Sequence, residues 1–177
     1  NDLLLLMKAA SGAGITARFG TAFLDQPGNI GNAGAVAEGH FLSAPFNAEV
    51  NPEETAAFME DYKSVTGHYP SYVEPTTVFG LMLLGEALKS VEPTENGLDA
   101  SKLAAALEQA TADTPMGKIS MRAEDHQIVQ SMIVQEVSRD AKYKADGTEF
   151  GFVPVTVIAP EDAQQPVQDS CKMKRPG

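Results

Sequence analysis

Basic residues are scarce in this sequence, and their scarcity argues against a nucleic-acid partner. The 177 residues contain 13 Lys and Arg against 24 Asp and Glu, which gives a formal net charge of −11 and a pI near 4.6. DNA and RNA attract proteins mainly through cations that neutralise phosphates. We therefore expect no nucleic acid among the partners of this protein.

Long apolar runs are missing as well. The densest apolar stretch, VFGLMLL from Val78 to Leu84, is much shorter than the roughly 20 residues of a membrane-spanning helix. We expect it to be a buried segment of a helix in a chain that does not span a membrane. The 43% of hydrophobic residues are enough for the packed core of a globular protein.

Cysteine is nearly absent too, since Cys171 is the only one. The chain opens on NDLLLLMKAA, in mid-helix and without an initiator Met, so we expect it to be the later part of a longer protein. The segment around Cys171, DSCKMKRPG, offers no fixed base that would activate a thiol. For an exported protein cut short, we expect a disulfide to a cysteine in the missing part, and an inert free thiol is the alternative.

Motifs of metal binding and catalysis are also missing. The three histidines, His40, His68 and His126, do not have the spacing of metal ligands, and neither a G-x-S-x-G nor a serine–lysine motif occurs. The acidic pairs fit helix starts and turns. The glycines of PGNIGNAG, residues 27–34, indicate a closely packed helix start, with an anion contact at the amides as the alternative. We expect no enzyme, no metal site and no cofactor.

Helical spacing of apolar residues predicts several helices. In the best-defined one, Asn51 stands at the N-cap, Pro52 at the first position, and Glu54 completes a capping box, and the helix runs to Gly67. A longer helix over residues 75–91 is apolar nearly all round, which predicts burial on several sides. The others are a remnant that ends near residue 12, a small-residue helix over residues 30–37, and a helix after Asp99.

Period-two alternation predicts the strands. Two come early, over residues 15–23 and 40–46, and the rest follow residue 117, in GKISM, QIVQSMIVQEV and FGFVPVTVIAP. Helices and strands alternate early and strands cluster late. The sequence therefore predicts an α/β fold made of packed layers.

Several stretches, in their order and spacing, resemble one family. These are NDLLLLMKAASGAG at the start, AVAEGHFLSAPF, then NPEETAAFMEDYKSVTGHYPSYVEPTTVFGLMLLGEAL, and finally the MRAEDHQ turn and the CKMKRP tail. Together they resemble the second half of the periplasmic binding proteins of branched-chain amino acid ABC transporters. The similarity runs through essentially all 177 residues.

The resemblance implies the C-terminal part of a two-lobed type I periplasmic binding protein, with three-layer α/β/α lobes and a hinge of three crossovers. Residues 1–45 would then be the remainder of the second lobe, residues 46–126 would return to the first lobe, and residues 127–177 would hold the final strands and the tail. It also implies a periplasmic location and ABC permease subunits as partners. The missing half would supply the groups that grip the ligand's carboxylate.

Two segments match the ligand-facing regions of that family. In TAFLDQPGN, residues 21–29, family members that bind amino acids carry an acidic residue for the ammonium group. Here Ala22 or Phe23 stands near that point and Asp25 follows slightly later. The resemblance therefore implies either an ammonium partner in Asp25 or an apolar, aromatic-lined pocket that suits aromatic carboxylates as much as leucine. A turn-stabilising role for Asp25 is the alternative. In SYVEPTT, residues 71–77, Tyr72 and Glu74 are the expected ligand contacts. A helix-start charge for Glu74 and a packing role for Tyr72 are the alternatives.

We thus expect a solute-binding component of an ABC importer, which captures an amino acid-like or aromatic carboxylate between two lobes without covalent chemistry. A sensor or regulatory ligand-binding domain of the same fold is the alternative. A hydrolase would need a nucleophile and base in the missing half. Fold likeness by itself does not separate these functions.

Overall fold

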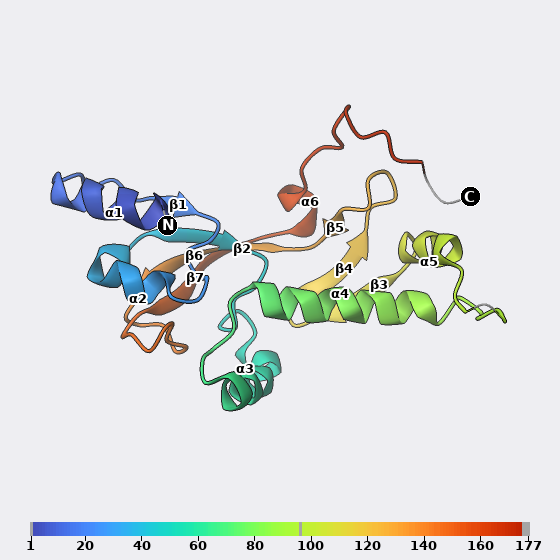
Figure 1. Cartoon of the computed structure of the whole chain (residues 1–177), viewed down its shortest axis with the longest axis horizontal. Helices are drawn as coiled ribbons and strands as arrows, with labels where there is room; N and C mark the ends of the chain where they lie inside the picture. Colours follow the sequence, from blue (N-terminus) through green and yellow to red (C-terminus); the bar gives the residue numbers. More distant parts are fainter. Residues whose placement is uncertain (1, 96, 175–177) are drawn as a thin grey trace. The chain divides into compact units, whose positions relative to one another are not determined.

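The computed structural model describes residues 2–95 and 97–174 and divides them into two units (Figure 1). The first unit holds the chain up to Pro75 together with Met132–Val157, and the second holds Thr76–Ser131 and the chain from Ile158 onward. The chain passes from one unit to the other three times. Among the described residues, no helix is both long enough and apolar enough to cross a membrane.

A four-stranded sheet forms the frame of the first unit, in the order β1-β2-β6-β7. β1 is parallel to β2, and β2 is antiparallel to β6 with Phe41 opposite Glu136 and Ala44 opposite Ile133. Buried and half-buried residues alternate along β6, as the period-two pattern predicts. The strands are β1 (Gly20–Thr21), β2 (Phe41–Ala44), β6 (Met132–Ser138) and β7 (Gly151–Ile158).

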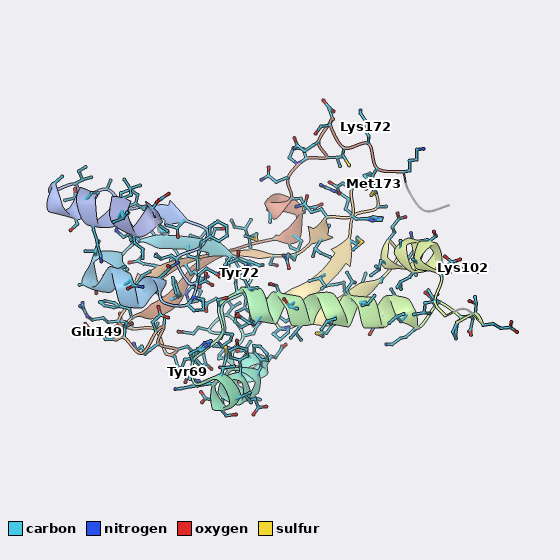
Figure 2. The ribbon with its side chains drawn as sticks, viewed as in Figure 1. Tyr69, Tyr72, Lys102, Glu149, Lys172 and Met173 are labelled. Atoms are coloured by element: carbon cyan, nitrogen blue, oxygen red, sulfur yellow. The ribbon has the colours of Figure 1, made fainter. Side chains whose placement is uncertain are left out.

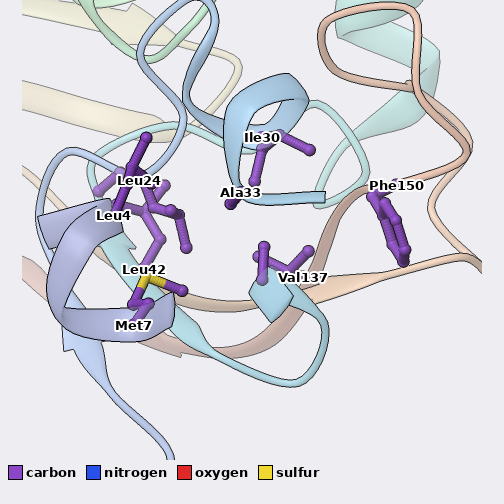
Figure 3. Close-up of a cluster of buried hydrophobic side chains, with 10 residues drawn as sticks. Leu4, Met7, Leu24, Ile30, Ala33, Leu42, Val137 and Phe150 are labelled. Carbon is purple, nitrogen blue, oxygen red and sulfur yellow. The ribbon is translucent and has the colours of Figure 1, made fainter. Parts of the chain in front are cut away.

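The core of this unit is a cluster of apolar side chains between the sheet and the first helices (Figure 3). Full burial of a side chain such as Leu42 stabilises the fold by about 1.5–3 kcal/mol. The helices that contribute to the cluster are α1 (Asp2–Gly12), α2 (Asn29–Ala33) and the 3-10 helix η1 (Gly34–Ala37). The buried members of the cluster, each at most 7% exposed, are Leu4 and Met7 in α1, Ile30 and Ala33 in α2, Ala37 in η1, and also Leu24, Leu42, Ala44, Val137 and Phe150.

The early elements follow the sequence predictions with two changes. The small-residue helix forms in two pieces, α2 and η1, because Gly34 adopts a positive φ of 61° between them. The strand predicted over residues 15–23 was too long, since only Gly20–Thr21 pairs with β2 and residues 15–18 are exposed. The strand predicted over residues 40–46 is confirmed as β2.

The helix predicted after Asn51 is confirmed as α3 (Pro52–Thr66), which ends at Gly67 with φ 83°. The predicted capping box is wrong, because the Asn51 side chain makes no capping hydrogen bond. Instead, the backbone oxygen of Asn51 accepts hydrogen bonds from the amides of Glu54 and Thr55, at 3.1 and 3.2 Å. The buried Thr55 hydroxyl donates to the backbone oxygen of Ala48 at 2.7 Å.

The long apolar helix is α4 (Val73–Leu88), and the prediction that it is buried on several sides is wrong for this chain. Leu83 is 1% exposed, whereas Leu81 is 61% exposed. Residues two apart on a helix point to different sides. One face of α4 is therefore packed and another is open.

The second unit contains a three-stranded antiparallel sheet in the order β3-β4-β5, with the helices α5 and α6. The helix predicted after Asp99 is confirmed as α5, and Asp99 caps it by accepting a hydrogen bond from the Ser101 amide at 2.9 Å. The sequence reasoning missed β3, whose residues TADT are short and partly polar. The elements are α5 (Ala100–Leu107), β3 (Thr111–Thr114), β4 (Gly117–Met121), β5 (Ile128–Val129) and α6 (Pro160–Ala163).

The MRAEDHQ turn follows β4 and is fastened by one arginine. The guanidinium of Arg122 donates to both oxygens of Asp125, at 2.8 and 2.6 Å, and to the backbone oxygen of Gln165 at 2.7 Å. The hydrogen bond from Arg122 holds the pKa of Asp125 below its usual value. The turn therefore also holds the segment after α6 in place.

Candidate functional site

The loop from Thr21 to Asn29 is anchored at its centre and presents an aromatic ring outward. Leu24 is fully buried in the core, whereas its neighbour Phe23 is 62% exposed. The Asn29 side chain donates a hydrogen bond to the backbone oxygen of Phe23 at 2.7 Å. The buried Leu24 beside it and the hydrogen bond from Asn29 to its own backbone oxygen thus hold Phe23 in a defined position at the surface.

Asp25 joins this loop to the segment before α4. Its Oδ2 accepts a hydrogen bond from the backbone amide of Tyr72 at 2.8 Å, and its Oδ1 has a longer contact of 3.4 Å with the Gln26 side chain. Burial raises the pKa of Asp25, and the nearby Glu74 carboxylate adds to the rise, although the hydrogen bond from Tyr72 opposes it. The Asp25 carboxylate therefore links its own loop to the segment before α4 and does not stabilise a local turn.

The other two predicted residues, Tyr72 and Glu74, lie at the start of α4, and Figure 2 shows Tyr72 there. Ser71, which is buried, donates from its hydroxyl to Glu74 at 2.8 Å and accepts from the Val73 amide at 3.2 Å. Burial, and then the negative charge of the nearby Glu74 carboxylate, raise the pKa of Tyr62. Tyr72 packs against the core cluster.

A pocket of about 70 Å³ opens in the first unit beside these residues. Asp25 and Tyr72 both line it, while Phe23 and Glu74 do not. The structure thus brings two of the four predicted residues to one cavity. The other lining residues are Pro27, Phe46, Asn47, Ala48, Glu49, Met59, His68, Tyr69, Pro70, Ser71, Gln135, Tyr143, Lys144, Ala145, Asp146 and Phe152.

A buried amide pair lies in the wall of this pocket, and the sequence reasoning missed it. Asn47 and Gln135 are 5% and 3% exposed, and the Asn47 amide donates to Gln135 Oε1 at 2.5 Å and to the backbone oxygen of Phe152 at 2.9 Å. Gln135 in turn donates to the backbone oxygen of Phe46 at 3.3 Å. The pair ties the end of β2 to β6 and β7. A glutamine at an inward position of a strand was the one available signal.

The amides of the PGNIGNAG segment do contact an anion, and it belongs to the chain itself. The Asp146 carboxylate accepts hydrogen bonds from the amides of Gly28 and Gly31, at 2.7 and 3.0 Å. Asp146 is 118 residues from Gly28 in the sequence. No pattern in the sequence indicated this contact.

The remaining candidates lie elsewhere. Cys171 is exposed and is not in a disulfide within the described residues, so its pairing stays a prediction. The last two residues of the CKMKRP tail, 175 and 176, and the final residue 177 lie outside the described residues. Among residues 2–95 and 97–174, no group of three His, Cys, Asp or Glu side chains is arranged to hold a metal ion.

Comparison with known proteins decides the family. The model of one family, described as periplasmic binding protein, matches residues 1–144. The chain belongs to the family of periplasmic binding proteins. One solved structure is that of a Brucella ovis protein named leucine-, isoleucine-, valine-, threonine- and alanine-binding protein, in its closed conformation. It is 62% identical to this chain and superposes with a TM-score of 0.93. The match covers 99% of this chain and 45% of that one. The predicted α/β fold of a type I periplasmic binding protein is thereby confirmed.

Curated relatives agree with this periplasmic binding protein fold. A Brucella abortus protein named Leu/Ile/Val-binding protein homolog 4 is 63% identical over all 177 residues, which make up 42% of that relative. A more distant solute binding protein from Rhodopseudomonas palustris, solved with 3,4-dihydroxy benzoic acid, is 23% identical with a TM-score of 0.60 over 89% of this chain and 42% of that one, and shows the shared fold. The chain spans less than half the length of the curated relatives that it matches. Each of these proteins is named as a binding protein and none as an enzyme.

Proposed function

We propose that the intact protein is the periplasmic solute-binding component of an ABC importer, which captures a small carboxylate ligand between two lobes and presents it to permease subunits. The observation that carries this proposal is the identity of 62–63% along the whole chain with proteins named for binding leucine, isoleucine and valine. Under this proposal, residues 1–45 complete the second lobe, residues 46–126 return to the first, and residues 127–177 cross the hinge again. Binding would shift an open to closed equilibrium without covalent chemistry.

The geometry of the loop Thr21–Asn29 supports a ligand-facing role for Phe23 and Asp25. A phenyl ring that is 62% exposed on an anchored loop is available as an apolar wall for a ligand side chain. Asp25 has one oxygen bound to the Tyr72 amide and only a long side-chain contact on the other, which leaves that oxygen the better acceptor for a ligand ammonium. A branched-chain amino acid would use both groups, whereas an aromatic carboxylate would use the ring.

Tyr72 and Glu74 complete the proposed set at the start of α4. Tyr72 lines the same pocket as Asp25, and its phenol joins an apolar face to a polar tip. Glu74 already accepts a hydrogen bond from Ser71, so we propose that it supports the Tyr72 segment and reaches a ligand only secondarily. The pocket volume of about 70 Å³ is well below the roughly 300 Å³ at which small-molecule sites begin. We therefore infer that the rest of the protein supplies the remainder of the site.

A thermal-shift measurement on the intact protein tests this function. L-Leucine, L-isoleucine and L-valine should each raise the melting temperature, because a ligand present at 100 times its Kd stabilises the folded state by about 2.7 kcal/mol. Leucine amide, which lacks the carboxylate, serves as the matched control and should give a much smaller shift. A shift with benzoate or 3,4-dihydroxybenzoate alone would assign the aromatic class instead, and the absence of any shift in this panel would refute the proposal.

Asp25 and Phe23 are tested by substitution in the same protein. Asp25→Asn should weaken L-leucine binding by roughly tenfold or more if the carboxylate pairs with the ammonium, because removing such a partner costs at least about 1.4 kcal/mol. The same change should leave benzoate binding unaffected. Phe23→Ala should weaken both ligands, and equal affinity of Phe23→Ala and the unaltered protein would remove Phe23 from the site.

A further inference from the structure

Asp146 lies on a tight turn that is itself firmly held. The turn joins β6 to β7, and the Ala145 amide donates to the backbone oxygen of Phe150 at 2.8 Å while the Thr148 amide donates to that of Ala145 at 2.9 Å. Phe150 is 3% exposed and belongs to the core cluster. Asp146 itself has a positive φ of 53°, a conformation that aspartate tolerates better than most residues. The core therefore fixes where the Asp146 carboxylate points.

That carboxylate meets the far end of the loop that carries Phe23 and Asp25. Both of its oxygens are used, one by the Gly28 amide at 2.7 Å and the other by the Gly31 amide at 3.0 Å. The approach is close, because a Cβ placed on Gly31 would lie 3.3 Å from the Asp146 Cβ. Hydrogen bonds from backbone amides to an ionised carboxylate are stronger than those between neutral groups.

The loop is thus held at three points by three different parts of the chain. Leu24 is buried in the core, Asp25 accepts from the Tyr72 amide, and Gly28 donates to Asp146. Gly28 has φ 85°, so the chain reverses direction at the residue that Asp146 contacts. Without that contact, the turn at Gly28 would keep the hydrogen bonds that the Asn32 amide and side chain donate to the Gly28 backbone oxygen, but it would lose its link to the β6–β7 connection.

We propose that Asp146 is a positioning residue for ligand binding. It acts as a built-in anion that fixes the amides of Gly28 and Gly31, and through them it sets the position of Phe23 and Asp25. This inference rests on the proposed function, in which the loop faces the ligand. Asp146 would tighten binding by ordering the loop in advance and not by contacting the ligand.

The test uses Asp146→Gly in the intact protein, since glycine accepts the positive φ and the change removes the side chain with its carboxylate. Glu149→Gln is the matched control, because it removes the same charge from the same β6–β7 connection, where Glu149 pairs with Arg139 at 3.1 Å and not with the loop. Asp146→Asn, which tolerates the same backbone and keeps one acceptor, should restore part of the effect.

Two readouts are expected to move. Hydrogen exchange at the Gly28 and Gly31 amides should speed up by about tenfold or more in Asp146→Gly and remain unchanged in Glu149→Gln. The Kd for L-leucine, or for benzoate if the unaltered protein shifts only with benzoate, should rise by about tenfold in Asp146→Gly, with Asp146→Asn in between. The urea midpoint of Asp146→Gly should stay close to that of Glu149→Gln, whereas a general loss of stability would lower it.

Unchanged exchange at these two amides would overturn the proposal, as would faster exchange with the same Kd as Glu149→Gln. A protein that binds neither probe would refute the proposed ligand classes. In that case the exchange result still decides whether Asp146 fixes the loop, so the two failures are distinguishable.

Discussion

The Asn47 side chain gives the sharpest test of how the first unit is held together. Its amide nitrogen donates to Gln135 Oε1 and to the Phe152 backbone oxygen, and its Oδ1 accepts from the Glu49 amide at 2.8 Å. Asn47→Ala removes three hydrogen bonds at a position that is 5% exposed. At about 1 kcal/mol for each bond, the free energy of unfolding should fall by about 3 kcal/mol.

Two further variants make this prediction specific. Asn32 donates a solvent-exposed hydrogen bond of 2.7 Å to the Gly28 backbone oxygen. Asn32→Ala should therefore lower the free energy of unfolding by about 0.5 kcal/mol or less. Asn47→Asp keeps the shape but has no N–H to donate, so it sets a buried carboxylate against two oxygen acceptors. A flip of the Gln135 amide would relieve one clash, but it would leave the Phe46 backbone oxygen without its donor.

Equilibrium unfolding in urea of the intact protein measures these differences. The expected order of stability is Asn32→Ala, then Asn47→Ala, then Asn47→Asp at pH 7. If Asn47→Ala unfolds at the same urea concentration as Asn32→Ala, the buried amide network does not contribute as argued. If Asn47→Asp is as stable as the unaltered protein, the assigned orientation of the two amides is wrong.

Three other outcomes follow from individual contacts. Because burial raises the pKa of Asp25, the folded state holds its proton more tightly than the unfolded state, and this carboxyl stabilises the fold less as pH rises from about 3.8 through its raised pKa. The stability of Asp25→Asn relative to the unaltered protein should therefore increase over that range. A constant difference in urea unfolding from pH 3.5 to 7 would contradict this. Gly151→Ala should unfold the first unit or destabilise it by more than roughly 4 kcal/mol, because its Cβ would clash with the Tyr143 backbone oxygen. Gly80→Ala meets nothing within 4 Å and should be tolerated. Asp99→Ala should destabilise α5 by about 1 kcal/mol through loss of its cap, seen as faster hydrogen exchange at the Ser101 amide, and equal exchange would refute the capping role.

The elements that sequence could predict are those whose signal is local. The helix α3 was predicted from Pro52 and its end at Gly67, because both residues restrict the backbone wherever they occur. Strand β6 was predicted from alternation along the strand itself. The strand β3 was missed because its partner β4, and not its own composition, makes it a strand.

The candidate site was only partly predictable, for the same reason. The family resemblance led to Asp25 and Tyr72, and the structure brings these two to one pocket. That the Asp25 carboxylate binds the Tyr72 amide, and that Asp146 binds Gly28, depends on segments that are 47 and 118 residues apart. Such contacts are set by the fold as a whole, and no spacing along the chain encodes them. Exposure of one face of α4 could not be predicted either, since an apolar pattern says that a face can be buried but not what covers it.

The pairing of β2 with β6 has a consequence for how this protein is made. Phe41 is opposite Glu136, so every residue of the second unit up to Ser131 lies between two strands that must become neighbours. On a growing chain, β2 has only the two-residue strand β1 beside it, and its other edge stays unpaired until β6 has been synthesised. Closing so long a loop is slow compared with local contacts. We therefore expect the first unit to depend on protection of that open edge during synthesis, and a chain that stops before Met132 to aggregate.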